Sequence, residues 1–202
     1  SFINFPNASL AKEPVKDNEI TLDDVNLEAG KVDMDTLPKA LKSKVEKRIK
    51  EVDSYFADLS QAAVDYKIQE KANKIDNAKL TDAKNKYEYL HKNSELLAGL
   101  TIVPDGEKVE EGTIITPFAT VEDVEVFKPT LYYDKWTAMY VMKGSWDWNF
   151  NPDLSPGGYD GFGLKTVQRK VSVLDSTLNT YNSSGTNTSH SYSRDAGSYG
   201  VG

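Results

Sequence analysis

The residues best suited to chemistry are aromatic, and they crowd into one stretch of the 202-residue chain. All three tryptophans lie in residues 132–162. The aromatic set is Tyr132, Tyr133, Trp136, Tyr140, Trp146, Trp148, Phe150, Tyr159 and Phe162. Flat aromatic faces on a sheet can stack on sugar rings while nearby Asp and Asn side chains bind the hydroxyls, which predicts a glycan-binding surface. Its expected ligand-binding residues are Tyr133, Trp136, Trp146, Trp148 and Tyr159. The alternative, which the alternation favours, is that these aromatics fill a β core and its cross-strand pairs.

A loop rich in Gly and Pro follows the last tryptophan and offers oxygen ligands for calcium. The four candidates are Asn149, Asn151, Asp153 and Asp160. An EF-type loop needs Gly at its sixth position, where this sequence has Leu154, and a closing bidentate Glu, which is missing here. Because Asx side chains also cap turns, we interpret the loop as a turn and expect no metal site.

The sequence lacks the motifs of the common enzyme classes. His91 and His190 are the only histidines, and neither stands in an HExxH-type spacing. Cysteine is absent, which excludes thiolate chemistry and disulfides, and there is no G-x-S-x-G elbow or phosphate-binding glycine motif. We therefore expect no catalytic residue and no cofactor, although 31 acidic residues leave a glycosidase-like carboxylate pair open.

The chain changes in composition near residue 99, so the elements that must position these residues differ on the two sides of that point. No Gly or Pro lies between Lys39 and Ala98, whereas nine of the thirteen glycines occur from Gly144 onward. Apolar residues in the first region recur at steps of three and four, which is typical of a helix with a heptad-like seam. The seam consists of Leu41, Val45, Ile49, Val52, Phe56, Leu59, Ala63 and Tyr66. Its phase slips before Asp76, so a helical hairpin over 36–99 is favoured over one coiled-coil rod that would self-associate.

Capping residues and charges complete the description of this helical region. We expect Thr36 as its N-cap, a further cap at Thr81 or Asp82, and Gly99 as the residue that ends it. The basic residues near its start form either a partner-binding or membrane-binding face or a solvated face with mixed charge. We favour the solvated face, because acidic residues are interleaved and a flanking aromatic edge is missing. These basic residues are Lys39, Lys42, Lys44, Lys47, Arg48 and Lys50.

Residues 100–202 are predicted to form an antiparallel β domain. Short runs of β-branched and aromatic residues alternate with turns, which favours a sandwich or a barrel and makes the whole chain α+β. The predicted strands lie at 101–103, 112–117, 121–127, 131–142, 146–150, 162–167 and 171–174. Residues 171–181 also have some features of the Ser/Thr-rich stem of a pore-forming toxin, although their alternation is broken.

The N-terminal residues suggest that the protein is exported. Residues 1–11 are uncharged and end in small residues, as the tail of a secretory signal peptide does, and residues 12–35 form an acidic extended lead-in. The chain ends in the middle of a pattern, so we expect the β domain to be truncated. A net charge of −7 argues against nucleic-acid binding, and no apolar run is long enough to span a membrane.

The segment Gly144-Ser145-Trp146-Asp147-Trp148, followed by Asp160-Gly161-Phe162-Gly163-Leu164, resembles uncharacterised secreted proteins of Bacillus-like Gram-positive bacteria that carry a Gly-x-Trp-x-Trp strand. The resemblance implies an exported β domain and no particular activity. Together with the N-terminus, it predicts a secreted, non-catalytic protein that binds cell-wall glycan or another envelope protein. A membrane-active toxin or bacteriocin-like protein and a secreted glycan-acting hydrolase are the alternatives.

Overall fold

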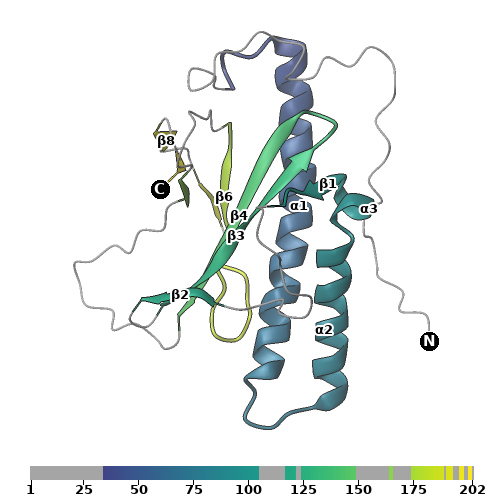
Figure 1. Cartoon of the computed structure of the whole chain (residues 1–202), viewed down its shortest axis with the longest axis vertical. Coiled ribbons are helices and arrows are strands. Elements are labelled where there is room, and N and C mark those ends of the chain that lie inside the picture. The colour runs from purple at the N-terminus through teal and green to yellow at the C-terminus, as the bar shows by residue number, and fades with distance from the viewer. Residues whose placement is uncertain are drawn as a thin grey trace.

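The computed structural model is an α+β fold, as the sequence predicts, in which a long helical hairpin packs on an antiparallel sheet (Figure 1). The structure describes residues 34–104, 117–121, 124–148, 164–165, 174–188, 190–192, 196–197 and 200–201. Its helices are α1 (Lys39–Glu70), α2 (Asn77–Lys92) and α3 (Ser94–Ala98). Its strands are β1 (Leu100–Ile102), β2 (Pro117–Val121), β3 (Val124–Asp134), β4 (Met139–Trp148), β5 (Leu164–Lys165), β6 (Ser176–Leu178), β7 (His190–Tyr192), β8 (Ala196–Gly197) and β9 (Gly200–Val201).

Helix α1 buries most of the predicted seam. Its buried residues are Leu41, Val45, Arg48, Val52, Tyr55, Phe56, Leu59 and Ala62, while Ile49, Ala63 and Tyr66 are partly buried. The buried stripe is wider than a coiled-coil seam, because α1 contacts α2, the sheet and the segment 174–188 rather than a single partner helix. The prediction of Thr36 as N-cap is wrong: the residue at that position is Pro38, which ends the preceding turn without a side-chain cap.

Helix α2 runs back along α1, so the predicted hairpin is confirmed and the single rod is wrong. Tyr66 stacks on Tyr87 with 6.2 Å between ring centroids, and Tyr55 donates a hydrogen bond of 2.7 Å to the carbonyl of Leu90. Asp76 begins the helix, since its carboxylate accepts hydrogen bonds from the backbone N–H groups of residues 78 and 79. The predicted caps at Thr81 and Asp82 therefore lie within α2 instead.

In the part of the chain that the structure describes, the main sheet is open and nowhere more than three strands wide. Strands β1 and β2 pair with opposite ends of the same edge of β3, and β4 pairs with its other edge along a register from Val124↔Trp148 to Asp134↔Met139. All of these pairings are antiparallel. Within the described residues the sheet does not close on itself, and the remaining strands form short two- and three-stranded sheets.

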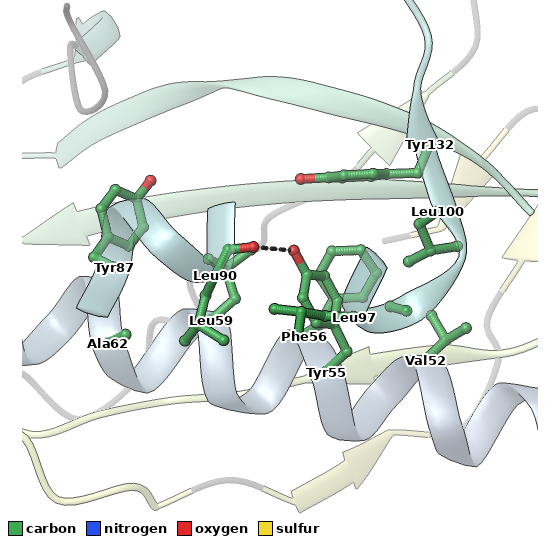
Figure 2. Packing of buried hydrophobic residues seen from close by; sticks show 11 residues of the cluster. Val52, Tyr55, Phe56, Leu59, Ala62, Tyr87, Leu90, Leu97, Leu100 and Tyr132 are labelled. Carbon is green, nitrogen blue, oxygen red and sulfur yellow. Dashed lines mark hydrogen bonds between the residues drawn. The ribbon is translucent and has the colours of Figure 1, made fainter. Parts of the chain in front are cut away.

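One hydrophobic cluster joins the helices to the sheet, and the expected boundary near residue 99 falls inside it. Phe56 of α1 meets Tyr132 of β3 edge to face at 5.1 Å, with Leu100 completely buried beside them (Figure 2). The cluster consists of Val52, Tyr55, Phe56, Leu59, Ala62, Tyr87, Leu90, Leu97, Ala98, Leu100 and Tyr132. Apolar side chains from both regions are removed from water together, which couples their stability.

The predicted strand 131–142 is wrong, because the chain reverses in its middle. Strand β3 ends at Asp134, residues 135–138 form a turn, and β4 begins at Met139. No Gly, Pro or Asn marks this turn, and Ala138 takes the left-handed backbone conformation with φ 59°. Trp136 and Ala138, which the alternation assigned to a strand, therefore lie in the turn.

The segment 174–188 runs along α1, on the side away from the main sheet in Figure 2. Thr177 donates a hydrogen bond of 3.0 Å to Asp53, and Gln61 donates one of 2.9 Å to the carbonyl of Gly185. The proposed toxin stem over 171–181 contains a described strand only at Ser176–Leu178. Leu174 lies outside any strand and packs on a second cluster with Met34, Leu37, Leu41 and Val45.

Several predictions fall on residues outside the described part of the chain. These are the signal-peptide segment 1–11, all of the lead-in except Met34 and Asp35, the strand over 112–116, the calcium candidates Asn149, Asn151, Asp153 and Asp160, and Tyr159.

Candidate functional site

The sequence-predicted ligand residues separate into two places. Tyr133 lies on β3 and Trp146 on β4, where the register puts them on the sheet face that points away from the helices, and position 148 belongs to the same face. Trp136 lies in the turn between these strands, against the helices. The structure therefore puts Tyr133 and Trp146 on the same face of the sheet but about 20 Å apart, since Tyr133 lies opposite Tyr140, six positions before Trp146 on β4. It removes Trp136 from that face.

Successive side chains along β4 point to opposite sides of the sheet, which gives the sheet two different faces. Val141 packs on the core, and Asp147 forms an ion pair with Lys67 of α1, so odd-numbered positions face the helices. Among the residues whose side chains the structure describes, the even-numbered positions that face outward are Tyr140, Met142, Gly144 and Trp146. None of these four residues carries a charge.

The best-described part of the outer face is a cross-strand pair of tyrosines. Tyr133 lies directly opposite Tyr140, and their rings contact each other in a tilted arrangement with 5.2 Å between centroids. The Tyr140 side chain is 63% exposed, and Leu131, opposite Met142, is 37% exposed. The pair thus presents aromatic surface to solvent on a rigid two-stranded support. We call Leu131, Tyr133, Tyr140 and Met142 the outer aromatic face.

The aromatic residues of β3 divide between the two faces of the sheet. Tyr132 is only 1% exposed and serves as core, while its neighbour Tyr133 points to the other side of the strand. The predicted ligand set omitted Tyr140, although it shares the parity of Trp146 and Trp148. Its even position in β4 could have placed Tyr140 in the predicted set. Its pairing with Tyr133 could not be predicted, because the sequence analysis did not expect a turn at 135–138.

Trp136 belongs to a buried polar cluster instead. The Arg48 guanidinium lies over its ring, 4.3 Å from the centroid, and also donates hydrogen bonds to the Asp134 carboxylate (2.8 and 3.4 Å) and to the carbonyl of Ala98. The Asp134 carboxylate accepts two further hydrogen bonds, from Thr137 Oγ1 at 2.7 Å and from the backbone N–H of Trp136 at 3.1 Å. The Arg48 guanidinium and the Asp134 carboxylate are both engaged with other groups of the cluster, so the cluster holds the turn in place.

This cluster also corrects the prediction of a fully solvated basic face on α1. Lys39, Lys47 and Lys50 are exposed as expected, but Arg48 is only 6% exposed. An arginine can be buried when a carboxylate and a carbonyl accept its hydrogen bonds, as they do here.

No three His, Asp or Glu residues in the described part of the chain are grouped to hold a metal ion. The described helices also include none with the length and apolarity that crossing a membrane requires. Comparison of the sequence and the structure with protein-family models, curated proteins and solved structures found no match.

Proposed function

We propose that this protein is a non-catalytic binding protein whose outer aromatic face takes a neutral glycan. The observation that carries the proposal is the Tyr133–Tyr140 pair, a ring contact of 5.2 Å that leaves Tyr140 63% exposed. Exposed aromatic rings held on paired strands offer flat apolar surface, which is what the C–H face of a sugar ring can stack on.

The chemistry of the face supports an uncharged partner. Leu131, Tyr133, Tyr140 and Met142 contribute no charge, so the face has nothing with which to pair the phosphates of an anionic polymer. Clustered apolar exposure of this kind is costly for a soluble chain and is typical of an interaction surface. Tyrosine hydroxyls would supply the hydrogen bonds that orient the sugar.

The cellular setting of the proposal is the bacterial envelope. It is supported by the signal-like residues 1–11, the absence of cysteine and the resemblance of residues 144–148 to a secreted Gram-positive family. Under this proposal the β region is completed as a sandwich or barrel around the open sheet. The described residues provide no specific feature in favour of the toxin or the hydrolase.

Titration with chitohexaose, a neutral sugar hexamer, tests the proposal by isothermal calorimetry. We expect saturable binding that Tyr140→Ala weakens about fivefold or more, because one stacking ring contributes about 1–3 kcal/mol. Tyr89→Ala is the matched control, since Tyr89 is another exposed tyrosine (38%) and lies on α2. Absence of saturable binding, or equal binding by Tyr140→Ala and Tyr89→Ala, would overturn the proposal.

A further inference from the structure

The outer aromatic face does not stop at β3 but continues onto β1. Leu100 is completely buried, so its neighbour Thr101 points to the other side of the sheet, where it is exposed. Thr101 lies directly opposite Tyr133, which in turn lies directly opposite Tyr140. The last three residues therefore form a row across β1, β3 and β4. We call it the hydroxyl row, because each of its side chains carries a hydroxyl group.

A second row of outward side chains lies beside the first. The backbone N–H of Val103 donates a hydrogen bond of 2.8 Å to the carbonyl of Leu131, which continues the register of β1 along β3. Val103 shares the outward parity of Thr101, and Leu131 lies opposite Met142. Val103 and Met142 are half-buried, and Leu131 is 37% exposed. We call Val103, Leu131 and Met142 the apolar row. None of the side chains in the two rows is charged.

In the other direction, along the strands, the face is interrupted by a β-bulge. The register shifts between Phe127 and Thr130, so two residues of β3 face the single residue Gly144 of β4. A bulge of this kind bends its strand and increases the local twist. Gly144 contributes no side chain, and the bulge contains the exposed, charged Lys128. Trp146 lies beyond the bulge, so within the described residues the apolar surface does not continue from the two rows to this tryptophan.

We propose that the glycan lies across the strands, along the hydroxyl row, and that Thr101 is a further ligand-binding residue. This placement rests on the proposed function, and it makes the ligand a disaccharide or trisaccharide segment of a neutral glycan. Adjacent strands are about 4.8 Å apart, so roughly 10 Å separates Thr101 from Tyr140 across the three strands. A short segment of sugar rings covers this span.

Each row contributes a different kind of contact. The apolar row and the tyrosine rings provide surface for the C–H faces of the sugars. The hydroxyls of Thr101, Tyr133 and Tyr140 both donate and accept, so they can pair with sugar hydroxyls, which have the same dual character. The ligand covers no charged side chain of the two rows, so no charge there has to be desolvated. Because backbone pairing fixes the three strands, the rows are in place before the ligand binds.

Isothermal calorimetry with chitotriose and chitohexaose tests the orientation of the ligand. We expect the two oligosaccharides to bind with affinities within about fivefold of each other, because only a short segment contacts the rows. A glycan that ran along the strands would need the longer oligosaccharide to reach Trp146, about 20 Å from Tyr140. A chitohexaose affinity that exceeds the chitotriose affinity by more than about fivefold overturns the crosswise placement.

Two substitutions of Thr101 test its hydroxyl with little change in shape. Thr101→Val keeps the β-branched side chain but removes the hydroxyl, and it should weaken chitotriose binding about fivefold, the usual effect of one hydrogen bond. Thr101→Ser retains a hydroxyl and should bind as the wild type does. Thr81→Val is the matched control, since Thr81 is an exposed threonine on α2.

The outcomes distinguish this placement from the proposed function itself. If Tyr140→Ala weakens chitotriose binding but Thr101→Val binds as the Thr81→Val control does, the placement is wrong and the glycan proposal stands. Equal weakening by Thr101→Val and Thr101→Ser also overturns the role of the hydroxyl. If neither oligosaccharide binds, the glycan proposal fails, and the placement fails with it.

Discussion

Arg48 on α1 and Asp134 at the end of β3 form a buried ion pair across 86 positions of sequence, with 2.8 Å between Nε and the carboxylate. Arg48 is 6% exposed and Asp134 is completely buried. The pair is fully satisfied, because the carboxylate also accepts from Thr137 and Trp136 and the guanidinium also reaches Ala98. It fixes the β3–β4 turn against the helices, and therefore also sets how the outer aromatic face is presented.

Asp134→Asn is expected to destabilise the protein by about 3–5 kcal/mol, because it leaves the Arg48 guanidinium buried without its countercharge. Urea unfolding followed by circular dichroism measures this free energy. Asp35→Asn is the matched control: it removes the carboxylate of the Lys42–Asp35 ion pair (2.9 Å), whose Asp35 side chain is 84% exposed. An exposed pair of this kind contributes less than about 1 kcal/mol.

Replacing both charged residues tests whether Asp134→Asn loses stability because a charge is left uncompensated or because packing is lost. Arg48→Met combined with Asp134→Leu should be more stable than Asp134→Asn alone, since no charge then remains in the interior. If the double variant is the less stable of the two, the cluster stabilises the fold through shape, and the electrostatic explanation is wrong.

Gly99→Ala is expected to destabilise the protein by about 1–3 kcal/mol. Gly99 ends α3 with φ +66°, and a Cβ there would lie 2.7 Å from Cη2 of Trp136. Thermal unfolding in a double-mutant cycle distinguishes the two causes. In a Trp136→Leu background the Gly99→Ala change should reduce stability less, since the close contact with the indole ring is then relieved. If the effects of the two substitutions on the free energy of unfolding are additive, backbone strain is the sole cause.

Asp76→Ala is expected to reduce stability by about 1 kcal/mol, because it removes the N-cap of α2. The Asp76 carboxylate accepts from the backbone N–H groups of Ala78 (3.1 Å) and Lys79 (3.2 Å). Asp82→Ala is the control, since Asp82 is an exposed carboxylate in the same helix. The chemical denaturation midpoints of the two variants provide the comparison, and equal midpoints would contradict the capping role.

The helices could be predicted because the spacing of apolar residues that defines a helix lies within a short stretch of sequence. Steps of three and four place Leu41, Val45, Val52 and Phe56 on one side of α1 whatever the partner is, and they are buried as expected. The burial of Arg48 could not be foreseen, because its acceptor lies 86 residues away and the flanking lysines are solvated.

The β hairpin shows a different limit of sequence reasoning. Its turn at 135–138 uses side-chain hydrogen bonds of Asp134 in place of Gly or Pro, so the aromatic alternation seemed to run straight through it. The prediction consequently placed Trp136 on the ligand surface and left Tyr140 out. The sequence correctly grouped the even-numbered residues of β4 on one face of the strand. The pairing of Tyr133 with Tyr140 could not be predicted without knowing where the chain reverses.

Alkaline pH is expected to unfold the protein through its buried tyrosines. Burial raises the pKa of Tyr87 and Tyr132 from the ordinary value of 10.0 to about 12, and it also raises that of Tyr55. Between these values the unfolded chain has lost protons that the folded chain retains, so stability falls as pH rises through this window. Lys143, whose pKa burial lowers from 10.5, acts in the opposite direction but only below that ordinary value.

The free energy of unfolding should therefore decline between pH 10.5 and 12 by up to about 1.4 kcal/mol per pH unit for each of these tyrosines. Urea titrations at several pH values measure the slope, and absorbance at 295 nm reports the ionised phenols. Tyr132→Phe should make the slope shallower, whereas Tyr140→Phe, at a 63% exposed position, should leave it unchanged. If Tyr132 ionises near pH 10 in the folded protein, with no loss of stability, its phenol is not buried in the core as its 1% exposure indicates.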